Sequence, residues 1–147
     1  LEFRRVLFRS TVLEFKDFIG PRVLTPIFHR IVPFRDKRKS YPKAVRNNYD
    51  YLGYQVWPMS AVNEMRKLTN KVKKELPKIK CPALIIHSTK DILSLQSNIS
   101  LVYDNISSEI KEKFIVHQAN HNLFINNPDQ EQIFQKINSF FNQFQRN

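Results

Sequence analysis

The chain has 147 residues and a formal net charge of +11, and 41% of its residues are hydrophobic. This length and composition suit one domain with an apolar core, and they exclude a disordered chain. A single cysteine, Cys81, excludes an internal disulfide and favours a reducing compartment, from which we expect a cytoplasmic location.

The positive charge is confined to the first part of the chain. Residues 1–80 hold 19 Lys and Arg against 7 Asp and Glu, whereas residues 81–147 hold 5 against 6. Such asymmetry is typical of a surface that meets nucleic acid or a membrane. The alternative is that acidic partners of these residues lie in a part of the protein outside this chain.

Residues 1–10 differ in character from the rest of the chain. They resemble a translated adapter sequence that recurs at the ends of proteins predicted from assembled reads, and a native basic amphipathic end is the alternative. We interpret the segment as non-native and leave it out of the predicted fold. Because the chain begins with Leu1 rather than Met, the sequence leaves the question of a targeting signal open.

Residues 11–57 are rich in proline, aromatic and basic residues and show little periodicity. Four prolines exclude a long helix, so we expect an irregular, mostly helical lid rather than a second sheet. The basic run at residues 35–39 has no recognition fold beside it, so we expect no nucleic-acid partner, while peripheral membrane contact through the basic lid stays open. Four aromatic residues either line an apolar channel or, as we prefer, pack into the lid core: Tyr49, Tyr51, Tyr54 and Trp57.

An amphipathic helix is predicted over residues 58–76. Apolar residues recur there at intervals of three or four, and Pro77 ends the pattern. The other faces are basic and suit solvent. The apolar stripe, which we expect to be buried, consists of Val62, Met65, Leu68, Val72 and Leu76.

The last part of the chain predicts two consecutive strand–helix units. Continuous apolar residues predict a strand over residues 83–87 and another over residues 112–116, both buried on two faces. Helices are expected over residues 96–106 and 128–144, the second with Asn127 as its N-cap. Their inner faces should consist of Ile99, Val102, Ile106, Ile133, Ile137, Phe140, Phe141 and Phe144. This alternation is typical of an α/β fold with a parallel sheet.

Asp91 and His121 each follow one of the two predicted strands. Because the carboxyl ends of neighbouring parallel strands meet at one edge of a sheet, both residues are expected in the loops that build the site. A carboxylate that accepts a hydrogen bond from one imidazole nitrogen orients the ring, and the other nitrogen can take a proton from a nucleophile. This pair is the candidate acid and base of a catalytic triad whose nucleophile the sequence does not show.

Several other kinds of site are excluded or disfavoured. Only two glycines are present, too few for a phosphate-binding loop, a dinucleotide fingerprint or a Gly-x-Ser-x-Gly nucleophile elbow. We interpret His87 and His117 as structural and His29 as solvated. Although His117 and His121 are four residues apart, they flank a loop rather than a helix, so we expect no metal and no other cofactor.

Residues from about 57 to 144 resemble the C-terminal part of α/β-hydrolase fold carboxylesterases and monoacylglycerol-lipase-like enzymes. The resemblance rests on LPKIKCPALIIH at residues 76–87, Lys90-Asp91 and Asn120-His121-Asn122-Leu123. Two motifs differ from the family pattern. A Val-Pro is usual shortly after the acid, where this chain has Ile92-Leu93-Ser94-Leu95, and a Gly is usual before the base, where it has Gln118-Ala119-Asn120.

The resemblance implies that Asp91 is the triad acid and His121 the triad base. It implies a lid remnant at residues 11–57 and the C-terminal part of a hydrolase core at residues 58–147. The parent would be a serine hydrolase of carboxylesterase or monoacylglycerol lipase type, acting on a small or lipid-like ester without a cofactor. Its Ser, oxyanion hole and earlier strands would lie upstream, so we expect this chain to be an inactive fragment.

Three alternatives stay open. An Asp nucleophile, as in haloalkane dehalogenases and epoxide hydrolases, would use a similar His. The protein could also be a non-catalytic relative of the fold. From a different class, it could be a basic binding module that acts through residues 22–80.

Overall fold

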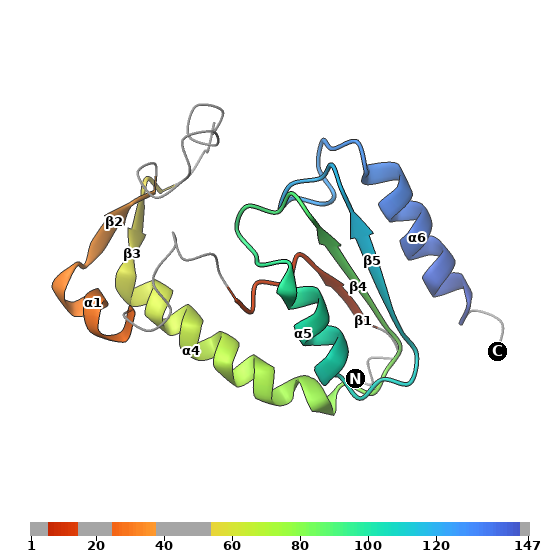
Figure 1. Cartoon of the computed structure of the whole chain (residues 1–147), viewed down its shortest axis with the longest axis horizontal. Coiled ribbons are helices and arrows are strands. Elements are labelled where there is room, and N and C mark those ends of the chain that lie inside the picture. Colours follow the sequence, from red (N-terminus) through yellow and green to blue (C-terminus); the bar gives the residue numbers. More distant parts are fainter. Residues whose placement is uncertain (1–5, 15–24, 38–53, 145–147) are drawn as a thin grey trace.

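The structure is a computed structural model of the whole chain, and it describes residues 6–14, 25–37 and 54–144. The elements are β1 (Val6–Arg9), α1 (Thr25–Ile31), β2 (Phe34–Asp36), β3 (Val56–Pro58), α4 (Met59–Glu75), the 3-10 helix η1 (Leu76–Lys78), β4 (Ala83–Ser88), α5 (Ser97–Asn105), β5 (Lys111–Val116) and α6 (Gln130–Asn142). A parallel sheet lies between α5 and α6, and a smaller part made of α1, β2 and β3, which is the described portion of the predicted lid, lies at the far end of α4 (Figure 1). The predicted α/β class is confirmed.

The sheet has the strand order β1–β4–β5, and both of its strand pairs are parallel. β4 is the central strand, and all six of its residues are buried. Its continuous apolar sequence suits this position, because a central strand with a helix on each side meets water on neither face. The prediction of a strand buried on both faces is confirmed here.

Each face of the sheet has its own apolar core. On one face, α5 packs against β4 and η1, as expected for the predicted inner face of this helix. This core contains Leu13, Leu76, Ala83, Ile85, Ile99, Val102 and Ile106. On the other face, α6 packs against β4 and β5 with the predicted stripe. That core contains Leu84, Ile86, Val116, Ala119, Leu123, Ile133 and Phe140, with Ile137, Phe141 and Phe144 packed at its margin.

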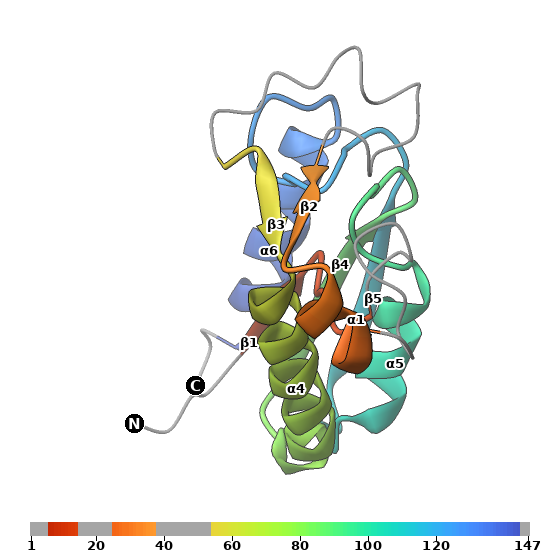
Figure 2. The same cartoon turned by 90° about the vertical axis from the view of Figure 1, so that its left-hand side faces the viewer.

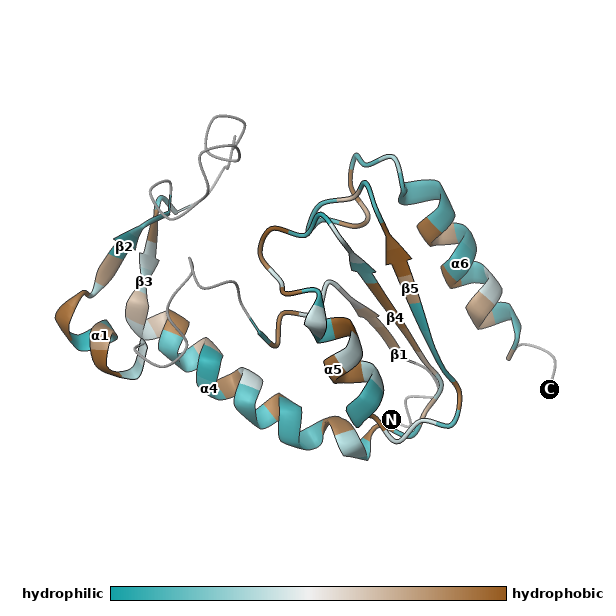
Figure 3. Cartoon of the chain, viewed as in Figure 1, coloured by the Kyte–Doolittle hydropathy of each residue, from teal (hydrophilic) through white to brown (hydrophobic). Residues whose placement is uncertain are grey.

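β5 departs from the prediction of a strand buried on two faces. It lies at the edge of the described sheet, and Ile115 is 38% exposed. Figure 3 shows a hydrophilic first half and a hydrophobic second half in this strand. Lys111 and Lys113 lie on the α5 side, where their Nζ atoms are 4.9 and 4.2 Å from the centre of the Tyr103 ring. The sequence of β5 has only three apolar residues in a row, at positions 114–116. So short a run does not reveal that one face of the strand is partly exposed to solvent.

β1 belongs to the sheet, so the prediction that left residues 1–10 out of the fold was wrong for residues 6–10, while residues 1–5 lie outside the described part of the chain. Val6 is paired with Ala83 and Arg9 with Ile86, and the N–H of Ser10 extends the ladder to the carbonyl of Ile86 at 3.0 Å. Four residues carry little periodic signal of their own, and β1 exists as a strand because β4 supplies its hydrogen bonds. Whether the segment is native stays a prediction.

The lid contains a small second sheet, which the sequence analysis did not expect. β2 and β3 pair antiparallel, with Arg35 opposite Trp57. Of the four lid aromatics, Tyr49 and Tyr51 lie outside the described residues and Tyr54 is 86% exposed. Trp57 does pack, against Met59, Val62 and Leu93, and Lys37 Nζ lies 4.5 Å from the centre of its ring. Prolines exclude a long helix but allow short edge strands, which explains the difference.

α4 runs from the predicted lid toward the sheet (Figure 1), and β3 leads into its first turn (Figure 2). The predicted helix is confirmed with bounds Met59–Glu75. Its apolar stripe is buried only at its ends. Val62 is buried and Leu76, just beyond the helix, is buried, whereas Met65, Leu68 and Val72 are 45%, 59% and 37% exposed. A periodic pattern identifies the apolar face of a helix but not the surface that covers it. In the described part of the chain, no helix is both long and apolar enough to cross a membrane.

Candidate active site

Asp91 and His121 meet at the carboxyl edge of the sheet. Asp91 lies in the loop after β4, and His121 lies in the loop after β5. Because β4 and β5 are parallel neighbours, with Ser88 opposite Val116 at their ends, the two loops leave the sheet side by side. His121 Nδ1 lies 2.9 Å from Asp91 Oδ2. The structure therefore brings together the two candidate residues, and their catalytic roles stay predictions.

The Asp91 carboxylate is fully buried and held from both sides. Its Oδ1 accepts hydrogen bonds from the N–H groups of Leu93 and Ser94 at 2.8 and 2.9 Å, and its side chain is 0% exposed. Burial raises the pKa of Asp91, but the hydrogen bonds from His121, Ser94 and Leu93 outweigh it and hold this pKa below its ordinary value. The group is ionised at neutral pH.

An ionised carboxylate can only accept, so the proton in the contact with Asp91 belongs to His121 Nδ1. The neutral ring then presents a lone pair at Nε2, which is the atom that a general base needs. The His121 side chain is 30% exposed, and no described residue forms a hydrogen bond with Nε2. The arrangement can therefore receive a proton from a group that approaches from outside the described residues.

The loop that carries His121 is anchored by two residues that the sequence analysis missed. Asp129 accepts hydrogen bonds at Oδ2 from the N–H groups of Gln118 and Ala119, at 2.6 and 2.8 Å. The Ser88 hydroxyl, at the end of β4, donates to the carbonyl of Ala119. An acid near the start of the predicted last helix was the available signal for Asp129, and nothing in the sequence pointed to Ser88.

The predicted N-cap at Asn127 was wrong. α6 begins at Gln130, with Asp129 at the cap position. Asn127 instead accepts the N–H of Asp129 at its side-chain oxygen, at 3.0 Å, which closes a turn before the helix. The capping-box pattern identified the right segment, but the Asp129 side chain caps no backbone N–H of its own helix and bonds the N–H groups of the loop before His121 instead.

The loop after β4 is also tied to the segment that follows β1. Ser94 Oγ donates to the carbonyl of Thr11 at 2.8 Å, and Asn98 Nδ2 donates to Ser94 Oγ at 2.8 Å. The Asn98 side chain exchanges two hydrogen bonds of 2.9 Å with the backbone of Glu14. These contacts hold in place the loop that carries Asp91, here called the acid loop, although this chain lacks the Val-Pro that usually follows the acid in the family it resembles.

Apolar side chains of the lid reach the acid loop. Leu93, two residues after Asp91, packs against Trp57, Met59 and Val62. The start of α4 and the end of β3 thus form an apolar wall beside the loop that holds the carboxylate. This wall links the lid to the pair at the carboxyl edge.

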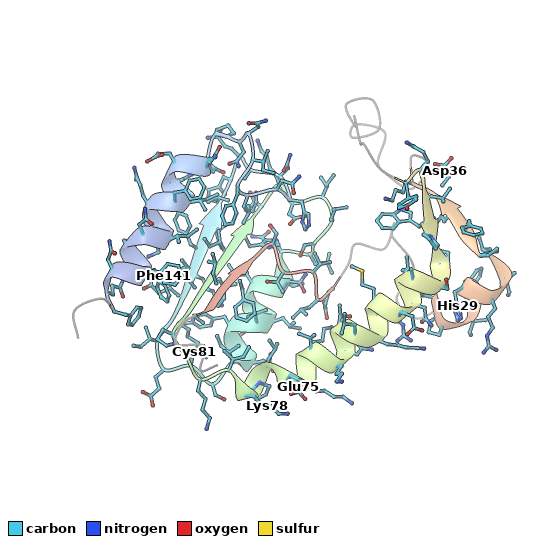
Figure 4. All side chains as sticks on the ribbon, turned by 180° about the vertical axis from the view of Figure 1, so that it is seen from behind. His29, Asp36, Glu75, Lys78, Cys81 and Phe141 are labelled. Atoms are coloured by element: carbon cyan, nitrogen blue, oxygen red, sulfur yellow. The ribbon has the colours of Figure 1, made fainter. Side chains whose placement is uncertain are left out.

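The other histidines and the cysteine lie in different surroundings. His87 is buried within β4, and His117 is exposed with its Nδ1 3.4 Å from Thr89 Oγ1. His29 is half-buried in the lid rather than solvated, with its Nδ1 3.0 Å from the carbonyl of Thr25. Cys81 lies before β4, at the opposite end of the sheet from the loops (Figure 4). No group of three metal-binding side chains is found within the described residues.

Low pH should destabilise this fold through protonation of Asp91 and Asp129. Burial raises the pKa of Asp129, but hydrogen bonds from Gln118, Ala119 and Gln132 outweigh the effect of burial. Like Asp91, Asp129 therefore has a pKa below the ordinary value of an aspartate. In the unfolded chain each acid titrates near its ordinary pKa of about 4, so the folded state binds fewer protons just below that pH. The stabilisation is complete above about pH 4 and is lost as pH falls through the lower folded pKa.

Urea unfolding at pH 7, 4, 3 and 2 checks this prediction. We expect the free energy of unfolding to fall below about pH 4. Asp91→Asn, which cannot titrate, should show a smaller fall than the unchanged protein. Equal acid sensitivity of the two proteins would contradict the assignment to Asp91.

A parallel sheet covered by helices on both faces, with Asp91 and His121 in contact at its carboxyl edge, is the arrangement expected of part of an α/β-hydrolase fold. The profile of the serine aminopeptidase S33 family matches residues 35–129, and the chain belongs to this family. A comparison with curated proteins finds no match.

Solved structures show the same fold. A metagenome-derived lipolytic enzyme is 22% identical, with a TM-score of 0.73 over 96% of this chain and 56% of its own. A monoacylglycerol lipase from Paleococcus ferrophilus is 20% identical, with a TM-score of 0.68 over 93% of this chain and 58% of its own. A monoglyceride lipase from Saccharomyces cerevisiae is 14% identical, with a TM-score of 0.69 over 97% and 56%. The chain thus spans little more than half the length of these structures.

Proposed function

We propose that this chain carries the acid and the base of a serine hydrolase that cleaves carboxylic esters. The observation that carries the proposal is the 2.9 Å contact between His121 Nδ1 and the buried carboxylate of Asp91. A buried ionised acid orients the ring and stabilises its charged form, while the partly exposed face of His121 presents Nε2. Asp91 is thus the orienting acid, and His121 is the general base.

In this mechanism His121 Nε2 removes the proton from a serine hydroxyl, whose oxygen attacks the carbonyl carbon of the ester. The resulting imidazolium then gives this proton to the departing alcohol oxygen, which leaves an acyl-enzyme. Water, deprotonated by the same nitrogen, attacks the acyl carbon, and the serine oxygen recovers the proton as the acid leaves. The Asp91 carboxylate stays ionised throughout and stabilises the imidazolium.

The serine would come from a part of the fold that this chain does not span. The chain spans 56% and 58% of two of the similar solved structures, and β1 has β4 as its one neighbour among the described strands. The exposed Met65, Leu68 and Val72 on α4 are consistent with a further layer of protein over that face. On this proposal the chain alone is inactive.

An ester with an apolar acyl group is the substrate class we favour. The apolar wall of Trp57, Met59 and Leu93 borders the acid loop, and the similar structures include lipolytic enzymes and monoacylglycerol lipases. The same acid–base pair also suits an Asp nucleophile, which would attack a halide or epoxide carbon instead. The identity of the nucleophile separates the two reactions.

A fluorophosphonate probe tests the proposal in the longer protein that includes the residues upstream of this chain. We expect a strand–Gly-x-Ser-x-Gly–helix there, covalent labelling of its serine, and loss of labelling in His121→Ala. An Asp in that position with no labelling would redirect the reaction to dehalogenase or epoxide chemistry. Labelling that survives His121→Ala would remove His121 from the mechanism, and the absence of any elbow would favour a non-catalytic relative.

A further inference from the structure

We propose that Asp129 is a positioning residue that sets the place of the His121 ring by holding the loop before it, together with Ser88. The inference rests on the proposed function and adds two residues to it. Neither side chain contacts His121 in the described structure, so the effect would pass through the backbone of residues 117–120.

The Asp129 carboxylate is aimed at this loop rather than at solvent. It is 2% exposed, and Oδ2 accepts the N–H groups of both Gln118 and Ala119. Oδ1 is held in turn by the side-chain amide of Gln132, at 2.6 Å. A carboxylate that accepts from three donors holds the two successive N–H groups of Gln118 and Ala119 in one orientation.

The opposite side of the same peptide segment is held by Ser88. Its hydroxyl donates to the carbonyl of Ala119 and accepts the N–H of Lys90, at 3.2 Å. Ala119 is itself 0% exposed. Both backbone groups of Ala119 are therefore bonded to fixed side chains, one at the start of α6 and one at the end of β4, two residues before His121.

His121 needs such an anchor because its own ring is 30% exposed and is not packed in place on every side. Two residues before this ring, the backbone groups of Ala119 are held by Asp129 and Ser88. A displacement of about 1 Å of a catalytic group is enough to lower a rate about 100-fold. Holding Ala119 thus keeps His121 Nδ1 within reach of Asp91.

A purely structural role for Asp129 is the competing explanation. An acid at the start of α6 also stabilises the helix dipole, which would affect stability without affecting His121. Glu131 provides a matched control, because it is an exposed acid in the first turn of the same helix, where it bonds Gln135 at 2.9 Å. Asp129 and Glu131 share the dipole effect, and the contact with the His121 loop belongs to Asp129.

The experiment compares Asp129→Ala, Asp129→Asn, Ser88→Ala and Glu131→Gln in the full-length protein. Steady-state ester hydrolysis gives kcat and KM, and NMR follows the Nδ1 proton of His121 in its bond to Asp91. For Asp129→Ala we expect kcat to fall about 10- to 100-fold with little change in KM, and the proton signal to shift or broaden. Asp129→Asn keeps an oxygen for the two N–H groups and should recover part of kcat, and Glu131→Gln should behave as the unchanged protein.

If Asp129→Ala does not fold, Asp129→Asn and Ser88→Ala are expected to show the same pattern with smaller losses. Unchanged kcat and an unchanged His121 signal in the folded variants would overturn the proposal. If the unchanged protein hydrolyses no ester, the proposed function fails, but the His121 signal still decides whether Asp129 positions this ring. The two failures are therefore distinguishable.

Discussion

In the full-length protein, Asp91→Asn is expected to lower kcat for ester hydrolysis about 10,000-fold. The reason lies in the hydrogen bonds around this side chain. The N–H groups of Leu93 and Ser94 require an acceptor, so the oxygen of the substituted amide would stay with them. The amide nitrogen would then face His121, donate to Nδ1, and move the ring proton to Nε2, where it blocks proton removal from the serine.

Kinetics on a nitrophenyl ester, with circular dichroism to verify folding, measure this effect. Asp104→Asn is the control, since Asp104 is a 64% exposed carboxylate whose oxygen lies 3.8 Å from Lys113 Nζ. His121→Ala should lose a similar amount of activity, and the double variant little more, because acid and base act as one unit. A loss smaller than about 10-fold in Asp91→Asn would contradict the assigned role of this residue.

Phe140→Ala is expected to lower the free energy of unfolding by about 3–5 kcal/mol. Phe140 is 0% exposed and lies in the core between α6 and the sheet. Its ring contacts those of Phe141 and Phe144 edge-on, with centroids 5.9 and 5.3 Å apart. Truncation leaves a cavity that fixed neighbours cannot fill, and the loss is large beside the roughly 5–15 kcal/mol that stabilises a typical domain.

Urea unfolding at pH 7 compares this variant with Phe134→Ala. Phe134 lies on the same helix but is 41% exposed, and its ring stacks on Phe124 at 5.6 Å. Its loss is expected to cost about 1 kcal/mol. If both variants lose the same stability, α6 does not pack on the sheet through the face described here.

Local sequence pattern was sufficient for the elements that carry the candidate site. The apolar run at residues 83–87 predicts β4, and the spacing of Ile99, Val102 and Ile106 predicts the buried face of α5, which the structure confirms. Both signals depend only on neighbours within a few residues. The parallel arrangement that they imply is also why Asp91 and His121 were expected at one edge of the sheet.

The anchors of the His121 loop could not be found in this way. Ser88 reaches Ala119 across 31 residues of chain, and Asp129 turns back across 10 residues to the same place. A serine at a strand end and an acid at a helix start are common in any sequence. The contacts of Ser88 and Asp129 with Ala119 form only when β4, β5 and α6 pack side by side.

The sequence by itself determined the α/β class, the two strand–helix units and the placement of Asp91 and His121 at one edge of the sheet, because these follow from apolar period and chain order. Only the tertiary structure decided that β1 joins the sheet and that β2 and β3 form a second one, since strands of three or four residues exist through the partners that bond them. It also decided which part of the α4 stripe is covered. The spacing of apolar residues shows which face of a helix or strand they share, whereas their burial depends on whether another part of the molecule packs against that face.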